Sequence, residues 1–184
     1  MFYEKYVAIE RMVDLTLMTL PEEDLVASED GLMENHQYFD VRGVSFSEAR
    51  EIIDEENELL KKILEASEVD QEDTVEDISE ALREDISPLS GFDIGVGGLV
   101  FALSSIGCTP ISSCNGGVVG GHHAHEHPWI IFYAPKNVVD ILLRAAEHAN
   151  VGLLNNDGGM LEVFSNNVLA FNRMADVLIS ADHA

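Results

Sequence analysis

The stretch that decides the fold is His127-Pro-Trp-Ile-Ile-Phe-Tyr-Ala134. Its branched and aromatic side chains are typical of a buried strand. Upstream of it, Thr109-Pro-Ile-Ser-Ser113 predicts a short strand that leads into the turn Cys114-Asn-Gly-Gly117. Downstream, apolar residues recur at helical spacing and predict a helix that ends near Gly152, with a core stripe of Val138, Val139, Leu142, Leu143 and Ala146.

The segments before and after this region also have the sequence patterns of strands and helices. Residues 153–154 and 160–164 predict two strands around a glycine-rich turn, and Asn166 or Asn167 is expected to cap a last helix. A further helix is expected from a cap at Asp93 up to Gly107. Residues 91–184 therefore predict an α+β core domain of order α-β-β-α-β-β-α, with a mainly antiparallel sheet.

Residues 1–90 are expected to form an acidic helical N-terminal region. Residues 6–20 carry an apolar stripe at helical spacing, and residues 37–41 could form a short strand. Ser45 and Glu48 have the spacing of a capping box, which predicts a helix to about Ser67 with the stripe Ala49, Ile52, Ile53, Glu56, Leu59, Leu60, Ile63 and Leu64. An acidic connector at 69–74 and a short helix over 75–86 complete the region.

Charge limits the classes of function. Ten Lys and Arg against 34 Asp and Glu give a formal charge of -24. Residues 1–90 hold 26 acidic and 7 basic side chains, whereas residues 91–184 hold 8 and 3. Such a surface would repel free nucleic acid and anionic membranes. With no signal-like N-terminus, no long apolar run and only two cysteines, we expect a cytoplasmic protein with reduced thiols.

A candidate ligand site is centred on the turn at Cys114. Successive backbone N–H groups around Gly116 could form an anion-binding nest and lower the thiol pKa, so Cys114 is the candidate catalytic residue. The expected ligand-binding residues are Ser113, Cys114, Asn115, Gly116, Asn156 and Asp157. The alternative is structural, since cysteines at strand ends are often buried and Asn-Asp-Gly sequences form turns.

Histidines follow this turn in the segment 122–127. On a strand, His123, His125 and His127 would face one side, as a three-histidine metal site requires. With Cys114 as a fourth ligand this group could bind zinc, although a solvated loop would explain the same pattern. No cofactor other than zinc is indicated.

The order of these motifs resembles the core of the wybutosine-synthesis methyltransferase family, which acts on tRNA. The resemblance covers roughly residues 93–170 and rests on Ser112-Ser-Cys-Asn-Gly116, the strand beside His127, and Gly152-Leu-Leu-Asn-Asn-Asp-Gly158. It implies a shared core fold. Gly117 and Leu154 stand where that family has basic residues. Because the chain also has few cations with which to hold tRNA, the activity of that family is not expected here.

Three classes of function remain. The first is an immunity- or inhibitor-like protein that docks on and neutralises a basic partner through acidic helices, with Glu55, Glu58, Glu72, Asp73, Glu76 and Asp77 as the contact residues. The second is a small-molecule- or metal-binding enzyme or sensor that uses the Cys114 turn and the 122–127 loop. The third is an acidic scaffold, and the chain could also form a homodimer. The asymmetry of charge favours the first.

Overall fold

The structure is a computed structural model that describes residues 6–21, 40–84, 87–117, 125 and 127–180. Within these residues lie five α-helices and five strands. The helices are α2 (Phe46–Glu65), α3 (Gln71–Glu84), α4 (Gly97–Ser105), α5 (Val139–Ala149) and α6 (Leu169–Ser180). The strands are β1 (Arg11–Met12), β2 (Thr109–Cys114), β3 (Trp129–Tyr133), β4 (Gly152–Asn155) and β5 (Leu161–Phe164). The predicted α+β class and the element order of the second half are confirmed.

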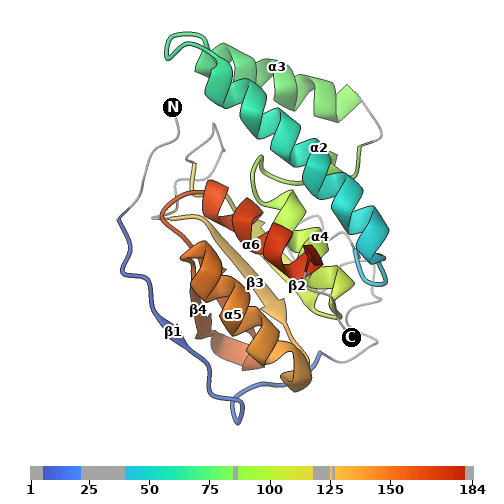
Figure 1. Cartoon of the computed structure of the whole chain (residues 1–184), viewed down its shortest axis with the longest axis vertical. Coiled ribbons are helices and arrows are strands. Elements are labelled where there is room, and N and C mark those ends of the chain that lie inside the picture. The colour runs from blue at the N-terminus through green and yellow to red at the C-terminus, as the bar shows by residue number, and fades with distance from the viewer. Residues whose placement is uncertain (1–5, 22–39, 85–86, 118–124, 126, 181–184) are drawn as a thin grey trace.

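One mixed sheet organises the molecule. Its strand order is β1-β4-β5-β3-β2, and every pairing is antiparallel except β1 with β4. Figure 1 shows α5 and α6 in front of this sheet and the antiparallel pair α2 and α3 at one end. Side chains of β3 alternate between fully buried and half-buried, which is expected when helices cover only one face.

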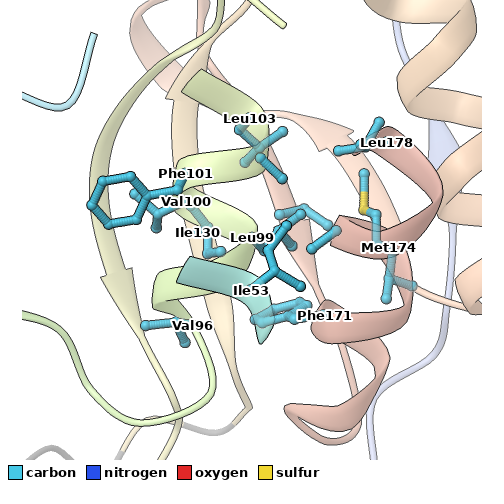
Figure 2. Close-up of a cluster of buried hydrophobic side chains, with 14 of the residues drawn as sticks. Ile53, Val96, Leu99, Val100, Phe101, Leu103, Ile130, Phe171, Met174 and Leu178 are labelled. Atoms are coloured by element: carbon cyan, nitrogen blue, oxygen red, sulfur yellow. The ribbon is translucent and has the colours of Figure 1, made fainter. Parts of the chain in front are cut away.

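The core lies between the sheet and the helices. Figure 2 shows side chains from four elements meeting there: Ile53 of α2, Leu99 and Leu103 of α4, Ile130 of β3, and Phe171, Met174 and Leu178 of α6. Helix α4 is buried on all sides, because α2 and α6 pack against it from one side and β2 from the other. Residues before and after residue 90 thus share one hydrophobic cluster. The division of the chain into an N-terminal region, residues 1–90, and a core domain, residues 91–184, stays a prediction.

The expected helix over residues 6–20 is wrong. This segment is non-helical, with a turn at residues 15–17, and its β1 adds a fifth strand to the sheet, where the Leu153 N–H donates to the Glu10 carbonyl at 2.9 Å. Tyr6, which the helical stripe assigned to the core, is 97% exposed. Asn155 holds the same segment by accepting from the Asp14 N–H at 2.6 Å. Pairing with the sheet edge has therefore overridden a chance helical spacing.

The helices of the acidic region follow the sequence more closely. Ser45 and Glu48 form the predicted capping box at the start of α2. Helix α3 begins at Gln71, inside the stretch that was expected to be a connector. The strand expected over 37–41 lies mostly outside the described residues, and its last two residues are not in a strand.

Candidate functional site

The turn after β2 requires glycine for its geometry. Gly116 and Gly117 both have positive φ angles, 69° and 68°. A Cβ atom on Gly116 would lie 2.7 Å from the carbonyl carbon of His127, so the backbones before β3 and after β2 approach too closely for any side chain there. The positive φ angle and the close backbone contact are sufficient to explain why residue 116 is glycine, so the glycine is not evidence for a bound ligand.

Asn115 is engaged inside the protein. Its Nδ2 donates to the Ile94 carbonyl at 3.2 Å, and its Oδ1 accepts from the Gly117 N–H at 2.9 Å. The Asn115 backbone N–H donates to Asp93 Oδ2 at 3.2 Å. Asp93 and Asn115 thus tie the turn to the segment before α4. Because Asn115 is also only 1% exposed, its side-chain amide serves the packing of the turn and is not presented to a ligand.

The thiol of Cys114 is less reactive than the sequence suggested. Burial raises its pKa above the ordinary value, and the neighbouring carboxylate of Asp93 raises it further. The Gly116 N–H, 3.3 Å from the sulfur, acts in the opposite direction without reversing the shift. The expectation that a nest of N–H groups lowers this pKa is therefore wrong, and the environment favours a packed thiol over a nucleophile.

The remaining residues of the predicted ligand site divide between two faces of the sheet. Ser113 is opposite Ile130, on the face that the helices cover, whereas Cys114 is opposite Trp129 on the other face. Asn156 lies beside that second face and donates from Nδ2 to Glu162 Oε2 at 2.7 Å. Asp157 is exposed at the start of a 3-10 turn, in which Gly158 has a φ of 70°.

The histidines of the 122–127 loop are only partly described. His123 lies outside the described residues. His125 is exposed, with its ring centroid 5.4 Å from that of Trp129, and His127 places Nε2 3.8 Å from Glu162 Oε1. In the described part of the chain, no three His, Cys, Asp or Glu side chains are grouped so that they could hold a metal ion. The zinc site stays a prediction.

A buried carboxylate that was not singled out as a site residue organises the glycine-rich segment. Glu56 of α2 is 1% exposed and accepts backbone N–H groups from Gly95 at 2.9 Å, Gly97 at 3.0 Å and Gly98 at 2.8 Å. Asn172 of α6 donates to the same carboxyl at 3.3 Å. Glu56, not Asp93, therefore caps α4, and the helix N-terminus is already occupied by an anion from within the chain. Burial raises the pKa of Glu56, while these hydrogen bonds oppose the shift.

The six acids expected to contact a partner all lie on one helical hairpin, α2–α3. Each of them is exposed: Glu55, Glu58, Glu72, Asp73, Glu76 and Asp77. Glu55 accepts from the hydroxyl of Ser87 at 2.7 Å, and Glu58 lies 3.9 Å from Lys61. Of the six, those on α3 have no cation within 4.0 Å among the described residues. The structure thus places all six acids at exposed positions of the α2–α3 hairpin.

Comparison of the chain with protein-family models, with curated proteins and with solved structures finds no match. The resemblance to the wybutosine-synthesis methyltransferases thus stays an interpretation of short motifs. Among the described residues, no helix is both long enough and apolar enough to cross a membrane.

Proposed function

We propose that this chain is an acidic binding protein that docks on a basic partner protein and neutralises it, in the manner of an immunity protein or inhibitor. The docking surface is the outer face of the α2–α3 hairpin. The observation that carries the proposal is the row of exposed carboxylates on α3, which holds six acids and one base in fourteen residues and forms no ion pair within 4.0 Å among the described residues.

The arrangement of these acids is costly for the isolated chain. Glu72 and Glu76, Asp73 and Asp77, Glu76 and Glu80, and Glu80 and Glu84 are like-charged pairs four residues apart on one helix. Each such pair destabilises a helix by about 0.2–0.5 kcal/mol, so α3 carries about 1–2 kcal/mol of repulsion. A cationic surface placed against the helix would relieve this repulsion, which gives the partner's charge an energetic role.

Apolar side chains at the tip of the hairpin complete the docking surface. Leu64 is 49% exposed at the end of α2, and Val69 is 87% exposed in the connection to α3. Both are surrounded in sequence by acids, among them Glu65, Glu68 and Asp70. An exposed apolar centre within a charged rim is the usual composition of a protein-binding surface. Long-range attraction would bring the partner in, and Val69 would then be buried against it.

The test compares two variants with the same net charge. In the first, Glu72, Asp73, Glu76 and Asp77 become lysine; in the second, Glu10, Asp140, Glu147 and Asp157, which are exposed outside the hairpin, become lysine. The native chain is purified from its host at low salt, the stoichiometric basic protein is identified by mass spectrometry, and its Kd is measured with each purified variant.

Reversing a charge at an interface rim costs about 1 kcal/mol, so the hairpin variant should bind about a thousand-fold more weakly. The affinity of the hairpin variant should also depend less on salt. The control variant and Cys114→Ala should bind within a few-fold of the native chain. Equal losses in the hairpin and control variants would show that net charge alone attracts the partner and would overturn the proposed surface.

A further inference from the structure

The five described strands carry only two charged residues, Arg11 and Glu162. Arg11 is opposite Leu153, a fully buried residue of the helix-covered face, and its guanidinium donates to Asn150. Glu162 projects from the other face. It is therefore a single carboxylate among the uncharged residues of that face, with its side chain 27% exposed.

The strand register determines what surrounds Glu162. Ile131 of β3 and Leu154 of β4 lie directly opposite it on either side. Two residues along β3 in each direction, Trp129 and Tyr133 point to the same face as Ile131 and are half-buried. Such diagonal neighbours are within reach of an aromatic side chain. Glu162 thus projects from the sheet at a position that Ile131 and Leu154 flank directly and that Trp129 and Tyr133 flank diagonally.

The carboxylate of Glu162 is held in place but only partly satisfied. Oε2 accepts from Asn156 Nδ2 at 2.7 Å, which fixes the orientation of the group. Within the described residues, Oε1 lies 3.8 Å from His127 Nε2, which is too far for a hydrogen bond. An ionised carboxylate has about four acceptor positions, so Oε1 remains able to accept from a ligand.

We propose that this face binds a small organic cation bearing an ammonium or guanidinium group. Its N–H groups would donate to Glu162 Oε1, and its charge would lie against the faces of Trp129 and Tyr133, as in cation–π recognition. A metal ion is the poorer fit, because among the described residues no third His, Cys, Asp or Glu joins Glu162 and His127 in a group that could hold one. The site is separate from the acidic hairpin and does not depend on the proposed partner.

Trp129 is the only tryptophan of the chain, so its fluorescence reports on this face alone. The probes are agmatine and butylammonium, with butyramide as a neutral compound of similar size. Binding is followed by Trp129 fluorescence and by calorimetry, for the native chain and for Glu162→Gln. The matched control is Glu147→Gln, an exposed acid on α5.

We expect saturable binding of at least one cation, about ten-fold or more weaker in Glu162→Gln and unchanged in Glu147→Gln. Trp129→Leu, followed by calorimetry, should also weaken binding several-fold and keeps the test decisive if Glu162→Gln fails to fold. Any one of three results would overturn the proposal: no saturable response to either cation at millimolar concentration, equal binding by Glu162→Gln, or equal binding of butyramide. A response to zinc without a response to the organic cations would assign the face to a metal instead, and would also overturn it.

Discussion

Replacing Glu56 tests the account of how the glycine-rich segment is held. Its carboxyl accepts four hydrogen bonds in a site that is 1% exposed. In Glu56→Gln, one oxygen becomes an NH2 group that faces backbone donors, so about two of the four bonds are lost. At about 1.5 kcal/mol for each bond to a buried polar group, the free energy of unfolding should fall by about 3 kcal/mol. Glu56→Ala removes all four acceptors and leaves a cavity, which raises the expected loss to about 5 kcal/mol.

The assays are urea unfolding and thermal unfolding, both followed by circular dichroism at one pH for all variants. A loss of about 3 kcal/mol corresponds to a decrease in Tm of about 6–12 °C in a protein of this size. The control is Glu51→Gln, an exposed acid of the same helix, which should change stability by less than about 0.5 kcal/mol. If Glu56→Gln were as stable as the control, the hydrogen bonds to Gly95, Gly97 and Gly98 could not be what fixes α4.

Three further predictions concern stability. Because burial raises the pKa of Glu56 above its ordinary value of 4.5, the folded state holds this proton more tightly than the unfolded state. The contribution of Glu56 to the free energy of unfolding should therefore be largest below pH 4.5 and decline as pH rises toward the folded-state pKa. It is measured as the difference between the native chain and Glu56→Gln in the free energy of unfolding at each pH. Ser45→Ala removes the capping box of α2 and should cost about 1 kcal/mol by urea unfolding, whereas Ser47→Ala beside it should cost much less. Gly152→Ala would place a methyl group against the ring of Phe164, so stability should fall by at least about 1 kcal/mol and the Tm by at least about 2 °C; an unchanged Tm would mean that Phe164 can move aside.

Local signals predicted most of the fold correctly. The continuous branched run of β3 and the amphipathic stripe of α2 each predict the type of element, because the spacing of apolar residues that distinguishes strand from helix lies within the segment itself. The N-terminal segment is different. Its spacing fits a helix, but its backbone pairs with β4, 142 residues further along the chain, and nothing local encodes that partner.

The candidate site was harder to predict from the sequence. The reactivity of a side chain depends on how deeply it is buried and on which face of the sheet it lies, and neither can be determined from short motifs. The sequence could not show that the Asn115 side chain hydrogen-bonds to the backbone of Ile94 and Gly117, or that Asp93 raises the pKa of Cys114. Two signals were nevertheless present in the sequence. Glu56 interrupts the apolar stripe of its helix, which marks a buried charge, and Glu162 is the only acid in the predicted strands of the second half.

The measurement that tests the central claim most directly is the Kd of the co-purified basic partner at low and moderate salt, for the native chain and the α3 lysine variant. The proposed docking surface predicts tight binding that weakens as salt rises, and about a thousand-fold weaker, less salt-sensitive binding by the variant. A chain that purifies alone at low salt, or a partner that binds the variant as tightly as the native protein, would contradict it.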